Sequence, residues 1–235
     1  GGSSGSSGSG DSSDSSDSSS SGDWAGALAA AALEAYIETV HRLYTRYPYA
    51  DGSKGFVLVV DPDDDDPPGQ RLSGTLSVDG GYFGPTLGRA GLDFELMVRR
   101  FGLALDAAPH LEIDPVDALT LGSAAFMIAP VLRPRWQVYA GIGLGFMIDG
   151  RTVPQQERVD VVGVNGTVRT TVLPVRPLVL RGRFDVGRLG AAPTLLGRVT
   201  AGVMVRRLEL FGGYEARKVG RVLALGPTAG VRLWF

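Results

Sequence analysis

Apolar and polar residues alternate with a period of two from residue 71 to the last residue, 235. In the first run, Leu76 and Val78 share one face, whereas Ser77 and Asp79 occupy the other. Successive side chains of a β-strand point to opposite faces, so each run of this kind predicts a strand with one apolar face. Residues 71–235 are therefore predicted to form an all-β domain.

The second face of these strands decides what the apolar face meets. A soluble barrel turns its apolar face inward and its charged side chains to water, whereas a membrane barrel turns its apolar face to lipid. Here the second face is mostly small or polar, as in the run from Trp136 to Ile148. Small residues fit a crowded lumen, so the pattern predicts a transmembrane antiparallel up-and-down β-barrel. A soluble lipocalin-like barrel is the alternative.

The length of the runs and the positions of the aromatic residues agree with a membrane barrel. The runs reach or exceed the roughly 9 to 11 residues that a tilted membrane strand needs. Aromatic side chains at strand ends are typical of the two interfacial girdles of such a barrel. One girdle is predicted to contain Phe101, Trp136, Trp234 and Phe235, and the other Tyr82, Phe83, Phe146 and Tyr214.

Tight and longer connections alternate between the predicted strands. Four tight connections carry Arg, namely Arg99-Arg100, Arg133-Pro134-Arg135, residues 174–177 and Arg206-Arg207. The longer linkers between them, predicted to be loops at the other barrel end, are GPTLGR, HLEIDPVD, residues 149–166, GRLGAAPT and residues 217–220. This arrangement predicts about ten strands. An eight-stranded barrel is the alternative if residues 151–177 contain no membrane strand.

The first 70 residues differ in character from the alternating domain. Residues 1–22 are almost entirely Gly, Ser and Asp, which predicts a disordered linker or an expression-tag remnant. Residues 23–46 predict one helix, because apolar residues recur there at helical spacing in Leu33, Ile37, Val40 and Tyr44. A short strand and the acidic turn DPDDDDPPGQ follow. The predicted parts are therefore 1–22, 23–70 and the barrel, 71–235.

Composition excludes several classes of function. The formal net charge is −2, from 23 basic and 25 acidic residues, so we expect no nucleic-acid partner. The chain has no cysteine, which excludes disulfides, thiolate catalysis and Cys-ligated zinc. No run of about 18 or more apolar residues is present, so no membrane-spanning helix is predicted.

A cluster of charged residues is predicted to point into the barrel. The interior of a barrel this small is largely filled by side chains. The residues on the predicted inward face are Asp93, Glu95, Arg181, Arg183 and Asp185. We expect these residues to pair and to plug the lumen, which leaves little room for open conductance.

The two histidines, His41 and His110, are the main candidates for catalysis. His41 lies on the predicted helix, where a packing or surface role is expected. His110 lies in a predicted outer loop near Glu112 and Asp114, and a hydrolase at the barrel rim needs such groups close together. A solvated polar loop is the favoured interpretation. No catalytic residue, cofactor site or metal site is therefore predicted.

The last strand resembles that of a known family. The C-terminal segment GPTAGVRLWF places Val231, Leu233 and the final Phe235 on one face. In this it resembles the terminal strand that bacterial outer-membrane β-barrels present to their assembly machinery. The resemblance covers residues 71–235 at the level of pattern. It implies an outer-membrane location, contact with outer-membrane lipid and with the barrel assembly machinery, and a periplasmic N-terminal segment.

The leading hypothesis for function is a non-enzymatic anchor or accessory subunit of an envelope assembly. The apolar stripe of the predicted helix needs a partner, and another envelope protein would supply one. The stripe could instead fill the lumen or lie on the inner leaflet. The alternatives are a small solute pore and a rim hydrolase that acts on peptides or lipids.

Overall fold

The computed structural model describes residues 47–49, 72–83, 87–98, 100–113, 116–150 and 160–235. The predicted linker, helix, short strand and acidic turn lie outside the described residues, apart from the segment 47–49. No helix in the described ranges is long and apolar enough to cross a membrane. The strands are β1 (Leu72–Phe83), β2 (Leu87–Val98), β3 (Phe101–Ile113), β4 (Val116–Arg133), β5 (Trp136–Asp149), β6 (Val161–Val172), β7 (Leu178–Leu189), β8 (Ala192–Val205), β9 (Leu208–Val219) and β10 (Val222–Trp234).

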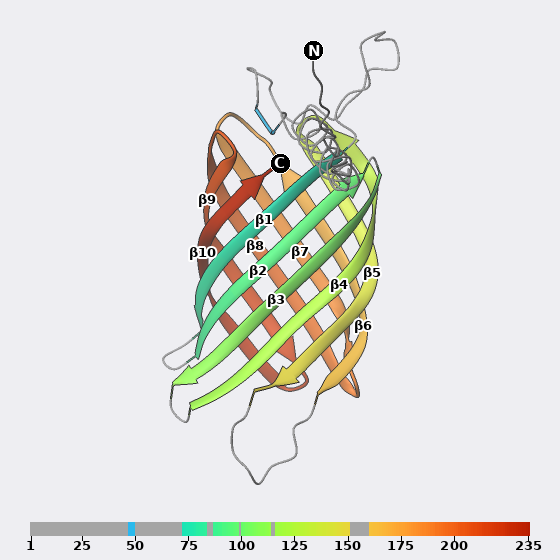
Figure 1. Cartoon of the computed structure of the whole chain (residues 1–235), viewed down its shortest axis with the longest axis vertical. Helices are drawn as coiled ribbons and strands as arrows, with labels where there is room; N and C mark the ends of the chain where they lie inside the picture. Colours follow the sequence, from blue (N-terminus) through green and yellow to red (C-terminus); the bar gives the residue numbers. More distant parts are fainter. Residues whose placement is uncertain (1–46, 50–71, 84–86, 99, 114–115, 151–159) are drawn as a thin grey trace, which may run out of the picture. The chain divides into compact units, whose positions relative to one another are not determined.

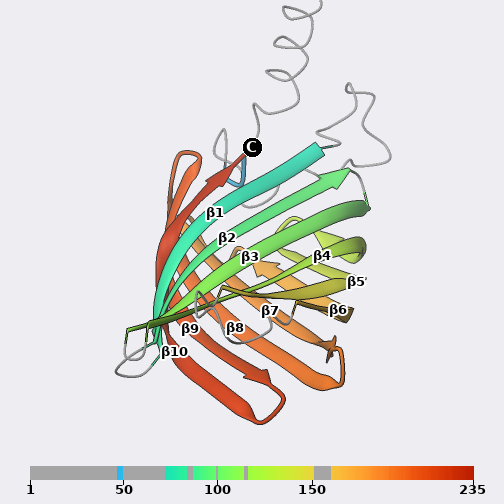
Figure 2. The ribbon, with the colours of Figure 1, turned by 60° about the horizontal axis from the view of Figure 1, so that its bottom comes forward.

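These strands form one closed barrel. Each strand pairs antiparallel with the next along the chain, and β1 also pairs with β10. The strands wind as a single tilted layer, as Figure 1 and Figure 2 show. The prediction of a ten-stranded up-and-down barrel is confirmed. The eight-stranded alternative is wrong, because β6 pairs with both β5 and β7.

The two ends of the barrel differ in what closes them. The terminal end is the end at which β1 begins and β10 finishes, at the top of Figure 1. The far end is the opposite one, at which β1 finishes and β10 begins. At the terminal end, the backbone of Phe235 closes the ring with two hydrogen bonds to Gly74, of 2.7 and 3.0 Å.

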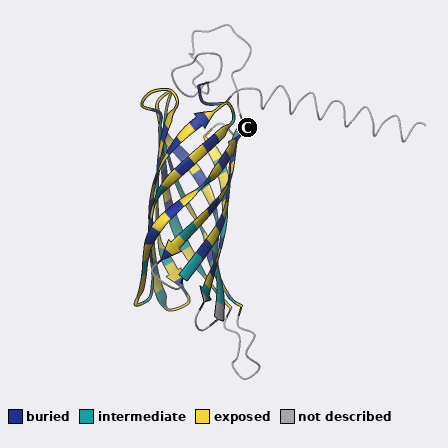
Figure 3. Cartoon of the chain, turned by 90° about the vertical axis from the view of Figure 1, so that its left-hand side faces the viewer, coloured by how far each residue is buried: buried dark blue, intermediate teal, exposed yellow. Residues whose placement is uncertain are grey.

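Burial alternates along the strands, with the apolar side chains outside. The outward residues Ile142, Val164 and Val199 are 77%, 67% and 68% exposed, whereas the inward Thr167 and Thr200 are buried. Figure 3 shows buried and exposed positions alternating along the ribbon. An apolar band of this extent is unfavourable in water and favourable against lipid. The chain is therefore a transmembrane β-barrel, as predicted, and the soluble alternative, with its apolar face inward, is wrong.

Four of the five predicted loops at the far end are strand ends instead. Two or three residues separate β1 from β2, β3 from β4, β7 from β8 and β9 from β10. The segment HLEIDPVD, for example, holds the paired ends of β3 and β4, up to Ile113 opposite Val116. The strands continue through these polar segments, because pairing with the neighbouring strand still provides hydrogen bonds to the backbone N–H and C=O groups there. In two of the tight turns, Gly190 and Gly220 adopt φ of 57° and 59°, which glycine tolerates best.

Glycines inside the strands mark places where neighbouring strands approach closely. A Cβ atom added at Gly143 would lie 2.0 Å from the carbonyl oxygen of Ala124, and one added at Gly213 would lie 2.1 Å from that of Val199. No larger residue fits such contacts unless the backbone moves. Close packing of strands therefore explains Gly143 and Gly213 better than a turn does.

The predicted aromatic girdles are correct only in part. Phe101, Trp136, Tyr82 and Tyr214 are exposed on the outer face. Trp234 and Phe83 were also predicted to face lipid, but they are buried, 4% and 6% exposed, on the inward face. The reason is the period of two: Trp234 follows Leu233 and Phe83 follows Tyr82, so both members of such a pair cannot share one face.

Candidate functional site

The lumen is filled by a network of buried arginines and carboxylates. Within the described residues, the ion pairs of the lumen join equal numbers of the two. The arginines are Arg89, Arg169, Arg181, Arg183, Arg198, Arg217 and Arg232, and the carboxylates are Asp79, Asp93, Glu95, Asp106, Asp185, Glu209 and Glu215. Buried ions need partners of opposite charge. The balance therefore makes this interior compatible with a lipid-embedded wall.

The middle of the lumen holds all five of the charged residues predicted to point inward. Arg183 lies 3.2 Å from Asp93 and donates from Nε to Asp185 at 2.8 Å. Arg181 forms an ion pair with Glu95. The period of two on β2 and β7 is enough to point all five side chains into the lumen.

Two further residues of the middle network were not among the predicted ones. Arg169 lies 3.0 Å from Asp93 and also pairs with Glu95, and Asp106 lies 2.6 Å from Arg183. Arg169 belongs to β6, in a stretch for which a strand was uncertain from sequence. The inward parity of β3 and β6 is the signal that would have found both.

These ion pairs cross the lumen from wall to wall. In the ring of strands, β2 and β7 lie opposite each other. The pairs Arg181–Glu95 and Arg183–Asp93 join these two strands, and Arg169 joins β6 to β2. The cavity left beside this network has a volume of only 30 Å³, which has room for a few water molecules at most. The middle of the barrel is therefore closed by side chains.

A second charged group lies closer to the far end. Arg198 bridges Asp79 at 2.8 Å and Glu215 at 2.7 Å, and Arg89 pairs with Asp79. Arg217 donates from Nε to Glu215 at 3.2 Å. This far-end group holds three guanidinium groups and two carboxylates, and the middle network next to it holds one carboxylate more than guanidinium groups.

The terminal end is closed by apolar packing. Leu173, Val179, Met204 and Trp234 form a buried cluster together with Tyr49, which precedes the barrel in sequence. The Tyr49 hydroxyl donates a hydrogen bond of 2.6 Å to the carbonyl oxygen of Leu178. Burial raises the pKa of the Tyr49 hydroxyl above its usual value. The segment before β1 thus contributes a side chain to the closure of this end.

Next to that cluster, Glu209 on β9 connects two inward side chains of β10. It is fully buried and accepts hydrogen bonds from Arg232 at 2.7 Å and from the indole of Trp234 at 2.8 Å. The Arg232 guanidinium also lies 4.3 Å from the ring centre of Phe211. Charged and aromatic groups therefore share the lumen wall at the terminal end.

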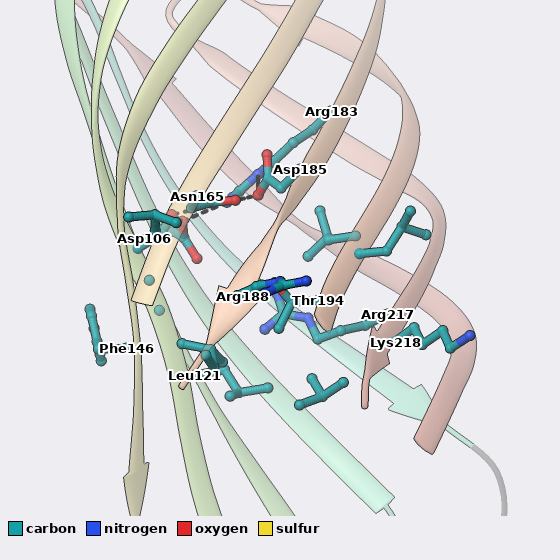
Figure 4. Close-up of a pocket in the computed structure, with 18 residues that line it drawn as sticks. Asp106, Leu121, Phe146, Asn165, Arg183, Asp185, Arg188, Thr194, Arg217 and Lys218 are labelled. Atoms are coloured by element: carbon teal, nitrogen blue, oxygen red, sulfur yellow. Dashed lines mark hydrogen bonds and ion pairs between the residues drawn. The ribbon is translucent and has the colours of Figure 1, made fainter. Parts of the chain in front are cut away.

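The far end has more open space. One cavity there has a volume of 60 Å³. Among its lining residues, Arg183 and Asp185 lie deeper in the barrel and Arg217 lies closer to the far end (Figure 4). Next to it is a cavity of 280 Å³ with mostly apolar walls, to which His110 and Arg217 contribute. The lumen is thus closed at its terminal end and middle and hollowed at its far end.

The remaining predicted residues have clear positions. Val231 and Leu233 face outward, 43% and 39% exposed, and the ring of Phe235 stacks at 6.4 Å on that of Phe94. His110 was predicted to lie in a solvated loop but belongs to β3 and is buried, because β3 continues beyond it. His41 and Asp114 lie outside the described residues. Among those described, no three His, Cys, Asp or Glu side chains are grouped as a metal site.

Comparison with known proteins finds similarity at the level of the fold. No protein-family model and no curated protein match the chain. The N-terminal β-barrel domain of Pseudomonas aeruginosa OprF is 12% identical over 69% of this chain and 97% of its own, with a TM-score of 0.38. Neisserial surface protein A is 11% identical over 69% and 94%, with a TM-score of 0.35. A major outer membrane protein from Thermus thermophilus is 14% identical over 70% and 99%, with a TM-score of 0.37.

These three proteins are bacterial outer-membrane β-barrels, the class that the C-terminal strand resembles. Their likeness to this chain extends to the barrel fold alone. With a closed ring of ten strands, an apolar outer face and a charged lumen, the chain is a ten-stranded transmembrane β-barrel.

Proposed function

We propose that this chain is a closed outer-membrane barrel that acts as a non-enzymatic anchor or accessory subunit of an envelope assembly. The observation that carries the proposal is the set of ion pairs joining β2 and β7 across the whole width of the lumen. A pore needs a continuous water-filled path through the lumen, and these ion pairs block such a path. A barrel without such a path supplies a stable membrane-embedded wall to which other parts can attach.

The strength of the cross-lumen pairs supports a permanently closed barrel. Removing one partner of a buried ion pair costs about 3–5 kcal/mol, because the other charge is left uncompensated. Moving Arg183 out of the way would leave Asp93, Asp106 and Asp185 with fewer partners. An ion passing through would have to disturb several such pairs together, so the closed state is expected to persist.

Conductance in planar lipid bilayers tests the closed barrel. We expect the wild-type protein to give no steady current. The double variant Arg181→Ala with Arg183→Ala removes two guanidinium groups from the middle of the lumen and should give measurable current steps. The matched control is Arg133→Ala with Arg135→Ala, which removes two exposed arginines around the β4–β5 turn and should remain silent. A large steady current from the wild type would instead favour the solute-pore alternative.

The anchor role rests on the segment that precedes the barrel. With ten strands, both ends of the barrel chain leave from the terminal end, which we assign to the periplasmic side. The face of Val231, Leu233 and Phe235 is proposed to be the signal read by the assembly machinery. The helix predicted within residues 23–46 would then lie in the periplasm, where its apolar stripe can dock on another envelope protein.

Site-specific photo-crosslinking in intact cells tests this docking. A photoreactive residue at Ile37 or Tyr44, on the apolar stripe, should form one discrete adduct with another envelope protein. The same residue at Thr39, on the opposite helical face, is the control and should give no such adduct. Adducts confined to residues of the barrel lumen would contradict docking and would make the helix a plug.

A further inference from the structure

The apolar cavity at the far end is a built pocket with one cationic group in its wall. Its volume is 280 Å³, close to the lower end of small-molecule sites. The apolar part of the wall comes from both sides of the barrel and consists of Leu87, Leu119, Leu121, Val219, Val222 and Ala224. An apolar hollow next to the charged far-end group is not explained by closure of the barrel.

Arg217 supplies the charge in this wall. It is only 9% exposed, and its single hydrogen bond within the described residues runs from Nε to Glu215. Both terminal Nη atoms are therefore left for a ligand. Asp79 and Glu215 are shared among the three guanidinium groups of the far-end group, and the hydrogen bond from Arg217 to Glu215 involves only Nε. A guanidinium with two free nitrogens matches a carboxylate, which it can bind with two parallel hydrogen bonds.

The other polar groups of the pocket refine the site. His110 donates from Nδ1 to the carbonyl oxygen of Ala108 at 2.8 Å, and its ring lies 6.2 Å from that of Phe83, so it forms a flat side of the wall. Glu112 is the one carboxylate in the lining, and it is half-buried two positions closer to the far end of β3. The negative charge of Glu112 repels an anionic ligand. Glu112 is more exposed to water than the buried Arg217, so its charge is screened more strongly, and the pocket favours an anion.

From these contacts we propose that the far-end cavity binds an amphipathic monoanion, a single-chain fatty acid of medium length. The carboxylate lies on the Nη atoms of Arg217, and the hydrocarbon chain fills the space between Leu119, Leu121 and Val222. This binding site is independent of the anchor role. It requires neither a conducting lumen nor a partner for the N-terminal segment.

Calorimetric titration of the folded barrel in non-ionic detergent tests the site, with decanoate and decanol as probes and protein-free micelles as the reference. We expect saturable binding of decanoate at one site. Arg217→Gln should weaken decanoate binding about ten- to a hundred-fold, the loss expected for hydrogen bonds to a charged group, and should change decanol binding little. The matched control, Arg221→Gln, removes an exposed arginine of the β9–β10 turn that does not line the cavity and should leave both probes unaffected.

A second variant keeps the test informative if Arg217→Gln fails to fold, which a boiled-against-unboiled gel would reveal. Glu112→Gln removes the opposing charge and should tighten decanoate binding several-fold while leaving decanol unchanged. The proposal is overturned if decanoate does not bind at a saturable site. It is also overturned if Arg217→Gln weakens decanoate and decanol equally, or if Glu112→Gln has no effect on decanoate.

Discussion

Arg183 on β7 reaches across the lumen to Asp93 on β2, where 3.2 Å separates its Nη1 from the carboxylate Oδ2. The two strands lie opposite each other in the ring and share no backbone hydrogen bonds. The pair therefore ties together two walls that only side chains can connect. Both charges lie away from bulk water, so either one left alone would be poorly solvated.

Replacing Arg183 should destabilise the barrel strongly. Arg183→Ala leaves Asp93, Asp106 and Asp185 without their shared partner, and we expect a loss of about 3–5 kcal/mol in the free energy of unfolding. Urea unfolding in lipid vesicles, followed by tryptophan fluorescence, measures it. Arg188→Ala on the same strand is the control, because Arg188 is exposed and has no ion pair among the described residues. Equal unfolding midpoints for the two variants would contradict the cross-lumen role of Arg183.

Tyr49 should govern access to the terminal end of the lumen. The chain has no cysteine, so Met204→Cys introduces a single thiol into the apolar cluster. We expect this thiol to resist a water-soluble maleimide while Tyr49 is in place and to react readily once Tyr49→Ala is added. Tyr49→Phe removes only the hydrogen bond to Leu178 and should leave the thiol protected. Rapid labelling with Tyr49 intact would show that this end is open.

A charge on the outer face should oppose membrane insertion. Ile142 lies mid-strand on β5 and is 77% exposed to the surroundings of the barrel. Arginine at a lipid-facing site near the bilayer midplane costs about 2–4 kcal/mol. Ile142→Arg should therefore lower the stability of the barrel in phospholipid vesicles by that amount, and Ile142→Leu should have little effect. Unchanged stability in Ile142→Arg would mean that this face does not contact hydrocarbon.

Two glycines offer a matched test of close strand packing. A Cβ at Gly143 would lie 2.0 Å from a backbone oxygen, whereas a Cβ at Gly197 would have no atom within 4 Å. Gly143→Ala should reduce the yield of heat-modifiable folded barrel severely, because the backbones of β4 and β5 would have to separate. Gly197→Ala should fold like the wild type. If both variants folded equally well, close approach would not be the reason for glycine at position 143.

The period of two determined which face each residue takes, and this could be read from the sequence. It predicted a barrel with Leu76 and Val78 outside and with Asp93 and Glu95 inside, because alternation is a property of each strand alone. The number of strands was also accessible, since turns interrupt the pattern. Phe83 and Trp234 were misjudged, because their position at a strand end was weighed above parity.

Only the tertiary structure decided which inward residues meet. Asp93 and Arg183 are 90 positions apart, and their contact depends on ring closure, strand register and tilt together. For the same reason, the sequence did not reveal the contacts of Arg169, the apolar hollow beside Arg217 or the closure of the terminal end by Tyr49. Each of these contacts joins strands or segments that are not neighbours in the chain, and no local pattern encodes the distance across a closed barrel.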